Sequence, residues 1–347
     1  MSILNFKIGK VKISNDGPAL IIPEVGINHN GSFKNAKLLV DSAFKAGAKI
    51  IKHQTHIPED EMSYHAKKIK PGNSNRNIFS IIENSCLTEI EEFNLKKYVE
   101  KKGMEYLSTP FSIKAVDRLV KMKVKAFKIG SGECNNIDFV EYIAKKGKPI
   151  ILSTGMNSLK TIEPSVKILK KYKLPFVLLH CTSIYPAPDN LLNLNAMNFL
   201  RKNFKCLVGY SDHSKGLNAA NTAMALGASV VEKHYVHSKK TIGPDVVCSM
   251  DSKDLKSLII SSPKIFYSLG KFKGPLKEEY KTIRFAFSSV VAKKNIKKGE
   301  KFTIDNLVYK RPGTGEIPSC NIKKLFGLKS KKNLKIDEQL KKKYIKK

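Results

Sequence analysis

Short apolar runs alternate with longer segments of mixed polarity along most of the chain. Each run spans about four residues, and the segment after it repeats its apolar residues with helical spacing. The runs are predicted to be strands, at 19–22, 48–51, 104–107, 126–129, 149–152, 176–179, 206–209 and 229–232. The helices predicted to follow them lie at 34–46, 88–102, 113–121, 138–145, 158–172, 190–201, 216–226 and 252–268.

A strand followed by a helix, repeated along a chain, predicts a parallel sheet and an α/β fold. Eight such units predict a closed (β/α)₈ (TIM) barrel, and residues 15–270 have the usual length for one. We therefore expect a barrel domain over residues 1–270. A long polar loop is expected between the second predicted strand and the helix at 88–102.

The rhythm changes after residue 270. Residues 271–286 are interpreted as a linker, and residues 287–347 show short β-like runs with turn signals. Residues 291–347 hold 18 basic and 5 acidic residues, a net charge of +13. A small β-rich domain ending in a solvated lysine tail is the prediction for this part.

Charge and composition limit the classes of function. The 347 residues carry a formal net charge of +33, yet only five of the 63 basic residues are Arg. Nucleic-acid-binding proteins favour Arg and aromatic clusters, which this chain lacks, so a specific nucleic-acid partner is not expected. No apolar run approaches the ~20 residues that span a bilayer, and the N-terminus lacks a secretory core. Six scattered cysteines favour reduced thiols and a cytoplasmic location.

The ends of the predicted strands are polar, and in such barrels they meet at one mouth. His213 and His234 end neighbouring strands, so both imidazoles can reach one cation. Carboxylates are expected beside them, at Glu24, Glu133, Asp212 and Asp245. This donor set predicts a divalent metal ion that prefers nitrogen and oxygen ligands.

An anion is the second expected ligand of the mouth. Lys52 and Lys128 end two strands, accompanied by Ser108, Thr109, Ser131 and Ser153. Ser131 lies between two glycines, which leaves backbone N–H groups free to approach a phosphate. A Schiff-base lysine is the alternative, and the histidine pair argues against it because a metal already polarises a carbonyl.

Several motifs, in order along nearly the whole chain, resemble the bacterial N-acetylneuraminate (sialic acid) synthases. They include EVGINHNG (24–31), IKHQTHIPEDEMS (51–63), FKIGSGECNN (127–136), LLHCTSIYPAP (178–188), GYSDHS (209–214) and EKHY (232–235). FAFSSVVA (285–292) and YKRPGTG (309–315) resemble that family's C-terminal antifreeze-like (SAF) domain.

The resemblance implies condensation of phosphoenolpyruvate with N-acetylmannosamine and water, giving N-acetylneuraminate and phosphate by C–O cleavage. His213 and His234 would bind Mn²⁺, or else Mg²⁺ or Co²⁺, with Glu24 and Glu133 as further catalytic residues. Phosphoenolpyruvate would be bound by Lys52, Thr109, Lys128, Ser131, Ser153, Ser183 and Ser211. The sugar would contact Gln54, Asn73, Tyr185, Asp245, Phe285 and Arg311. The family's homodimer exchanges its C-terminal domains, so the last two residues would come from the partner.

Two features qualify this resemblance. Close sialic acid synthases often carry Asn where this chain has Ser183, which has less reach toward a phosphate. The alternative substrate within the family is a 2,4-diacetamido trideoxy sugar, as used by legionaminate or pseudaminate synthases. The run KHQTHIPEDEMS favours the sialic acid branch, because the equivalent in the others often reads KFQT.

Overall fold

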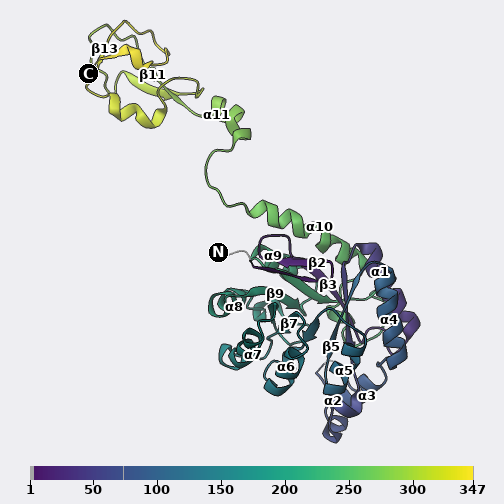
Figure 1. The fold of residues 1–347 in the computed structure, drawn as a ribbon. Coiled ribbons are helices and arrows are strands. Elements are labelled where there is room, and N and C mark those ends of the chain that lie inside the picture. Colours follow the sequence, from purple (N-terminus) through teal and green to yellow (C-terminus); the bar gives the residue numbers. More distant parts are fainter. Residues whose placement is uncertain (1–3, 73, 347) are drawn as a thin grey trace. The chain divides into compact units, whose positions relative to one another are not determined.

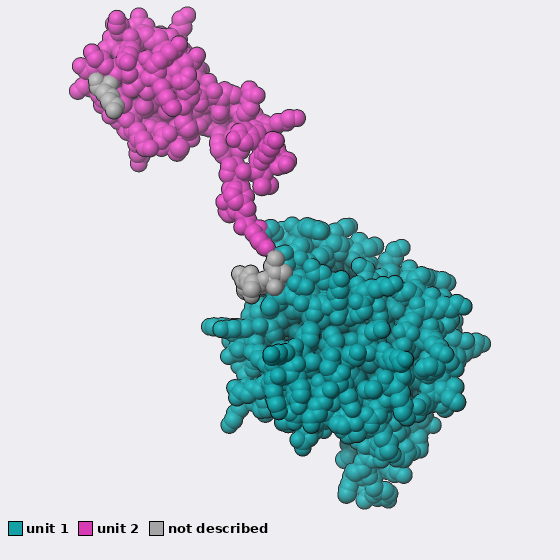
Figure 2. Space-filling model, in the orientation of Figure 1, with its two compact units in different colours: residues 1–270 teal, residues 271–347 magenta. Residues whose placement is uncertain are grey.

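The computed structural model describes residues 4–72 and 74–346, and the chain divides into two compact units. Residues 1–270 form the barrel unit and residues 271–347 the C-terminal unit, coloured teal and magenta in Figure 2. Each unit has its own apolar core and is described by itself.

Eight parallel strands form the barrel, in the order β5-β4-β3-β10-β9-β8-β7-β6. The edge strands β5 and β6 lie next to each other, which brings the sheet round to a nearly closed barrel (Figure 1). The strands are β3 (Leu20–Gly26), β4 (Ile50–Thr55), β5 (Glu105–Pro110), β6 (Phe127–Ile129), β7 (Ile150–Ser153), β8 (Phe176–Cys181), β9 (Leu207–Asp212) and β10 (Val230–His234). The predicted strands and the (β/α)₈ architecture are thus confirmed.

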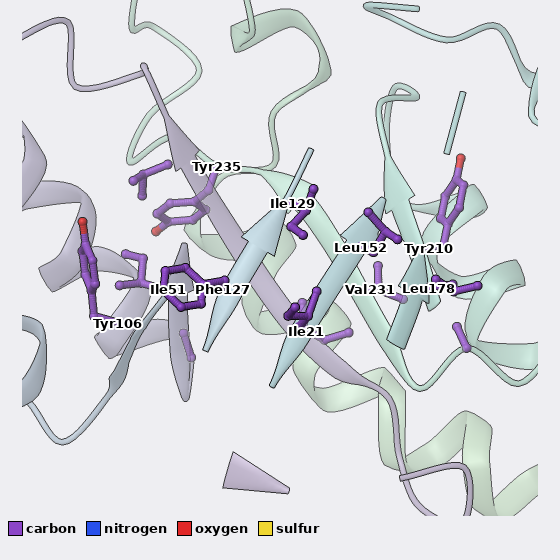
Figure 3. Packing of buried hydrophobic residues seen from close by; sticks show 14 of the residues in the cluster. Ile21, Ile51, Tyr106, Phe127, Ile129, Leu152, Leu178, Tyr210, Val231 and Tyr235 are labelled. Atoms are coloured by element: carbon purple, nitrogen blue, oxygen red, sulfur yellow. The ribbon is translucent and has the colours of Figure 1, made fainter. Parts of the chain in front are cut away.

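Helices cover the outside of the strands (Figure 1). They are α1 (Phe33–Ala46), α4 (Glu89–Lys101), α5 (Ile113–Lys121), α6 (Ile137–Ala144), α7 (Leu159–Lys171), α8 (Ala196–Phe204), α9 (Asn218–Ala225) and α10 (Ser252–Leu269). Several begin at a side-chain cap, such as Thr88, which forms a capping box with Glu91 on α4. Outward strand residues such as Ile21, Phe127 and Leu152 pack in the large apolar cluster between strands and helices (Figure 3).

A hairpin that was not predicted from the sequence closes one end of the barrel, the end at which the barrel strands begin; we call it the lower end. Strands β1 (Asn5–Ile8) and β2 (Val11–Ser14) pair antiparallel around a turn in which Gly9 has φ +55°. Phe6, Ile8 and Ile13 are buried against the inward residues of the barrel strands. The alternation of NFKI and VKIS around Gly9 is a hairpin signal that was available in the sequence.

The connection between β4 and α4 is more structured than the predicted polar loop. It contains α2 (Pro58–Glu61), a 3₁₀ turn (Tyr64–Lys68) and α3 (Ile78–Glu83). Asn77 caps α3 by accepting a hydrogen bond from the backbone of Ser80. Ile81 and Ile82 of α3 pack on Ile27, which follows β3. This small apolar cluster holds the connection against the loop after β3.

The C-terminal unit is β-rich, with short antiparallel pairs β11 (Ser289–Ala292) with β12 (Leu307–Lys310) and β13 (Lys329–Ser330) with β14 (Ile345–Lys346). Its core includes Val290, Phe302, Leu325 and Leu340. Residues 271–286, interpreted as a linker, include the short helix α11 (Tyr280–Ala286). The expected solvated tail is wrong in part, because Tyr344 and Ile345 pack on this core while neighbouring lysines remain exposed.

Candidate functional site

The interior of the barrel changes character along each strand. The lower inward positions are apolar, as in Ile22, Ile50 and Val230, and pack together above the hairpin. Two residues further along the same strands, the inward side chains are polar and buried. These are Glu24, Lys52, Thr109, Lys128, Ser153, Ser211 and Glu232, with Cys181 beside them. They form the upper layer of the barrel, at the carboxyl ends where active sites of this architecture lie.

Two lysines and two carboxylates balance each other in the upper layer. Lys52 pairs with Glu24, and its Nζ lies 3.9 Å from Glu232 Oε1. Lys128 Nζ lies 4.0 Å from the same oxygen and donates to Ser153 Oγ at 2.6 Å. Burial raises the pKa of Glu24 to about 7, although Lys52 opposes that rise. Burial also lowers the pKa of Lys128.

Unpaired polar atoms gather in this layer. Thr109 Oγ1, Glu232 Oε2 and His234 Nδ1 are buried and have no hydrogen-bond partner within the described residues. Buried polar atoms in native proteins are nearly always paired, so a cluster of unpaired ones marks a place that a ligand or water completes. The layer therefore fits a polar ligand that would contact Lys52, Lys128 and Thr109.

Next to the lysines, small side chains surround the backbone of Gly155. The N–H of Gly155 donates to Ser131 Oγ at 3.0 Å, and Ser131 Oγ lies 3.1 Å from Cys181 Sγ. A Cβ at position 155 would lie within 3 Å of Cys181 Sγ, Ser183 Oγ and Ser131 Oγ. The glycine required here is thus Gly155. The glycines on either side of Ser131, which the sequence analysis emphasised, meet no close neighbour.

His213 and His234 face each other across β9 and β10, with ring centroids 5.7 Å apart. Tyr185 stands beside them, its ring centroid 4.2 Å from that of His213. His213 Nδ1 donates to the carbonyl of Thr182 at 2.9 Å, so its Nε2 keeps a lone pair. Burial lowers the pKa of His213 to about 4 and that of His234 to about 3. Both imidazoles are therefore in the neutral form that binds metals.

Asp212 does not join the histidines, contrary to the sequence prediction. It accepts from Lys233 Nζ at 2.8 Å and from the backbone N–H of Ser214 at 2.8 Å. Both side chains are buried on the outer face of the strands. Inward and outward positions alternate along a strand, so the Lys233–Asp212 pair fixes β9 against β10 with His213 and His234 on the inner side. Within the described residues, no group of three or more metal-binding side chains occurs. The histidine pair alone fits a divalent ion whose other ligands are substrate and water.

A cavity of about 330 Å³ opens beside the mouth. Its polar lining includes Gln54, Glu133 and Asp245, and its apolar wall comes from Ile27, Phe111 and the β4–α4 connection. Asp245 Oδ2 lies 3.8 Å from His234 Nδ1, so the cavity adjoins the histidine pair. Glu133 accepts from Asn136 Nδ2 at 2.8 Å. The structure thus brings two of the predicted sugar-binding residues, Gln54 and Asp245, together with the predicted catalytic residue Glu133.

Other residues of the polar strand ends and of the predicted set lie elsewhere. Ser108 and His53 point away from the mouth: Ser108 Oγ is 2.7 Å from Thr55 Oγ1, and His53 contacts Tyr106. His53 is therefore turned away from a substrate in the mouth, and the difference between KHQT and KFQT carries no direct evidence about the sugar. Gln54 of the same run does line the cavity. Asn73 lies outside the described residues. Phe285 and Arg311 belong to the C-terminal unit, where both side chains are exposed.

The upper layer also contains residues missing from the predicted set. Glu232 lies between the two lysines, and Cys181 lies beside Ser131. The sequence could have indicated both residues, because side chains two residues apart on a strand point to the same face. Glu232 is two residues before the predicted metal ligand His234, and Cys181 is two residues before the predicted phosphate ligand Ser183.

Comparison with known proteins identifies the family. Residues 39–274 match the NeuB family, and residues 287–346 match the SAF domain. The chain is 39% identical to an N,N'-diacetyllegionaminic acid synthase of Campylobacter jejuni, over 92% of this chain and 98% of the relative. It is 30% identical to the human N-acetylneuraminate-9-phosphate synthase, over 93% and 90% respectively.

A solved structure supports the same relationship. The N-acetylneuraminic acid synthetase of Leptospira borgpetersenii superposes with a TM-score of 0.74 at 33% identity, covering 81% of this chain and 95% of the other. In the described part of the chain, no helix is long and apolar enough to cross a membrane. The sequence matches and the barrel with its polar upper layer lead to one conclusion: the chain belongs to the NeuB family, with a SAF domain following its barrel.

Proposed function

We propose that this protein condenses phosphoenolpyruvate with N-acetylmannosamine and water to give N-acetylneuraminate and phosphate. One observation carries the proposal: a buried pocket with two lysines and unpaired polar atoms adjoins a neutral histidine pair. An anion and a carbonyl compound can therefore be held side by side.

The anion side would hold phosphoenolpyruvate. Lys52, Lys128 and Thr109 are suited to its carboxylate and phosphate oxygens, because they are buried donors in the upper layer. Ser131, Ser153 and Ser211 supply hydroxyl donors, and the backbone of Gly155 comes close enough to narrow the pocket. Ser183 lies 3.8 Å from Cys181 Sγ, at the edge of this group, where a shorter side chain than Asn leaves more room.

The sugar side would lie at the histidine pair and the adjoining cavity. A divalent ion bound by His213 and His234, Mn²⁺ in our proposal, would polarise the open-chain aldehyde as a Lewis acid. Gln54, Tyr185 and Asp245 would bind sugar hydroxyls. Glu24, protonated more readily because burial raises its pKa to about 7, can give a proton to the aldehyde oxygen.

Three bond changes complete the proposed reaction. The C3 carbon of phosphoenolpyruvate bonds to the aldehyde carbon, whose oxygen takes a proton. A water oxygen then adds to C2, and Glu133 at the cavity wall is the candidate to accept its proton. Finally the bond between C2 and the bridging oxygen breaks, and phosphate leaves with that oxygen.

Phosphoenolpyruvate labelled with ¹⁸O in the bridging position should therefore transfer the label to phosphate. Label kept in the sugar acid would overturn this order of bond cleavage.

The decisive experiment supplies phosphoenolpyruvate with each candidate sugar and identifies the product by mass spectrometry. N-acetylmannosamine is expected to give N-acetylneuraminate. The second candidate is a 2,4-diacetamido trideoxy sugar, favoured by the 39% identity to a legionaminic acid synthase. A higher kcat/KM with that sugar would change the substrate and keep the reaction. Absence of product with every sugar would refute the proposed function.

We also propose that the protein acts in the cytoplasm as a homodimer with exchanged C-terminal units. Arg311 and Phe285 would then approach the acetamido group of the sugar in the partner's barrel. Mixing an Arg311→Ala variant with a His213→Ala variant should restore some activity, because a mixed dimer pairs one intact barrel with one intact C-terminal unit. No recovery after verified subunit exchange would exclude this arrangement.

A further inference from the structure

A buried chain of polar side chains runs along the outer face of β4 and β5. His53 Nε2 lies 3.2 Å from His29 Nε2, and His53 Nδ1 lies 3.0 Å from Tyr106 Oη. Tyr106 donates to Glu92 Oε1 at 3.1 Å. All four side chains are at most 2% exposed. His53 and Tyr106 are on the strand face opposite to that of Lys52 and Thr109, because successive residues of a strand point to opposite faces. A buried network of this kind lowers the stability of the fold wherever one of its polar atoms lacks a partner.

The chain has a defined direction. Arg118 Nη1 donates to Glu92 Oε2 at 3.1 Å, and Glu92 remains an acceptor because the neighbouring donors lower its pKa against the effect of burial. Tyr106 therefore donates to Glu92 and accepts from His53 Nδ1. Burial lowers the pKa of His29 to about 3, so its neutral ring shares one hydrogen bond with His53 through the two Nε2 atoms. His53 is thus the link between the β5–α4 side of the barrel and the loop that carries His29.

That loop is tied in turn to the sugar side of the site. Asn28 Nδ2 donates to the carbonyl of Tyr235 at 3.0 Å and to Ser249 Oγ at 3.1 Å. Asn30 Nδ2 donates to the carbonyl of Ile242 at 2.9 Å. Ser249 Oγ donates to the carbonyl of Asp245 at 2.7 Å. The residues on either side of His29 therefore hold the segment 235–249, which carries Asp245.

We propose that His53 is a positioning residue for the sugar half of the site. Its bond to His29 holds residues 27–30, and through Asn28 and Asn30 it holds the segment with Asp245 in place beside the cavity. In the anion half, Lys128, Ser131 and Ser153 stand on β6, β7 and the turn after β6, away from this chain. Lys52 and Thr109 stand on β4 and β5, where the pairing of the two strands holds their backbone whether or not His53 is bonded to His29. The kinetic part of this inference rests on the proposed function, whereas the structural part does not.

Three variants on β4 test the inference. His53→Phe keeps an aromatic ring and removes both nitrogen atoms, so it breaks the links to His29 and Tyr106. His53→Gln keeps an acceptor near the position of Nε2 and should restore the link to His29. Thr55→Val is the matched control, because it alters the same outer face at Glu92 and Ser108 without touching His29.

We expect His53→Phe to raise the KM for the sugar about tenfold, with kcat and the KM for phosphoenolpyruvate changed less than about twofold. His53→Gln should recover most of the loss, and Thr55→Val should leave the sugar KM unchanged. An equal rise of both KM values in His53→Phe, or an equal effect of Thr55→Val, would show a general structural role and overturn the proposal.

Hydrogen exchange gives a readout that needs no activity. The backbone N–H groups of Asn30, Ser32 and Cys248 are hydrogen-bonded in the native loops. In His53→Phe these amides should exchange faster than in the wild-type protein, while amides of β7 stay protected. Unchanged exchange at Asn30 and Cys248 would overturn the proposal even if the sugar KM changed. If the wild-type protein makes no product from any sugar, the proposed function fails and the exchange data alone decide this inference.

Discussion

The lower and upper layers of the barrel interior stand on the same strands, and a step of two residues separates them. Ile22 lies below Glu24, Ile50 below Lys52, and Val230 below Glu232. The lower residues fill space and meet the hairpin, whereas the upper ones leave polar atoms unpaired. The first inward residue of a strand therefore contributes to stability, and the next inward residue of the same strand contributes to the site. Substitutions in the lower layer should affect folding alone, and those in the upper layer should affect activity first.

The largest expected effect is in the upper layer, at the histidine pair. His213→Ala or His234→Ala should lower kcat/KM by about a thousandfold or more, because the Lewis acid contributes several kcal/mol. The free energy of unfolding should fall little, as each imidazole leaves only a small polar space. Steady-state kinetics and urea unfolding measure the two effects separately.

Chelation provides the control for the histidine variants. Removing divalent ions from the wild-type protein should abolish activity, and adding Mn²⁺ should restore it. Full activity after exhaustive chelation would refute the metal assignment. The role of the upper layer in activity would then have to be tested with variants of Lys52 and Lys128.

The lower layer should show the reverse behaviour. Leu107→Ala or Ile151→Ala removes a fully buried side chain beneath Thr109 or Ser153, and should cost about 2–5 kcal/mol of stability. Ile151→Val should cost only about 0.5–1.5 kcal/mol. The activity of the folded fraction should remain unchanged, as measured below the unfolding transition. A loss of activity without a loss of stability would break the distinction between the layers.

A smaller effect concerns the pH dependence of stability in metal-free protein. The pKa of His234 is lowered by burial to about 3, from an ordinary value of 6.5. The unfolded chain therefore binds a proton at this position below about pH 6.5 while the folded chain does not. Stability falls as pH falls, by about 2 kcal/mol between pH 6.5 and 5 from this residue. In the His234→Gln variant, the free energy of unfolding should fall by about 2 kcal/mol less between pH 6.5 and 5, as measured by urea unfolding at several pH values. An unchanged slope would mean that His234 is protonated in the folded protein.

Arg311 should show the smallest effect, and only on the sugar. The side chain is exposed in the C-terminal unit, so Arg311→Ala should leave stability unchanged. If it donates to the acetamido carbonyl, its loss should lower kcat/KM for the sugar about tenfold, with phosphoenolpyruvate binding nearly intact. Arg311→Lys should recover little, because an ammonium cannot reproduce the planar guanidinium. Equal activity of all three proteins would remove Arg311 from the site.

The alternation of strand and helix was enough to predict the barrel, and the order of polar strand ends was enough to predict its mouth. Orientation at those ends was harder to predict, because motifs such as KHQT are polar on both faces of the strand. Lys52 and Gln54 face the mouth, while His53 and Thr55 face the helices. Asp212 and Ser108 were misplaced for the same reason. Outward polar residues are tolerated here because each finds a buried partner, such as Lys233 for Asp212.

The small elements were missed for a different physical reason. The hairpin at residues 5–14 and helix α3 are each too short to be stable alone, and both depend on apolar partners distant in sequence. The local pattern shows that Ile8 and Ile81 are apolar. It does not show that Ile8 packs on the lower layer of the barrel or that Ile81 packs on Ile27. The second unit was predictable as β-rich, whereas the packing of Tyr344 and Ile345 at the chain's end depends on its folded core.

The hairpin at the lower end of the barrel makes residues that are synthesised early depend on residues that are synthesised late. The partners of Phe6 and Ile8 include Leu207 and Val230, which are translated about two hundred residues after them. At ~5–20 residues per second, the nascent chain carries these side chains uncovered for about 10–45 s. Within the barrel, the last strand β10 pairs with the first strand β3, so the wall and the lower end both depend on β10. β10 ends at His234, so the barrel can close before the C-terminal unit is made, and until β10 is made Phe6 and Ile8 lack part of the cover that they have in the folded barrel.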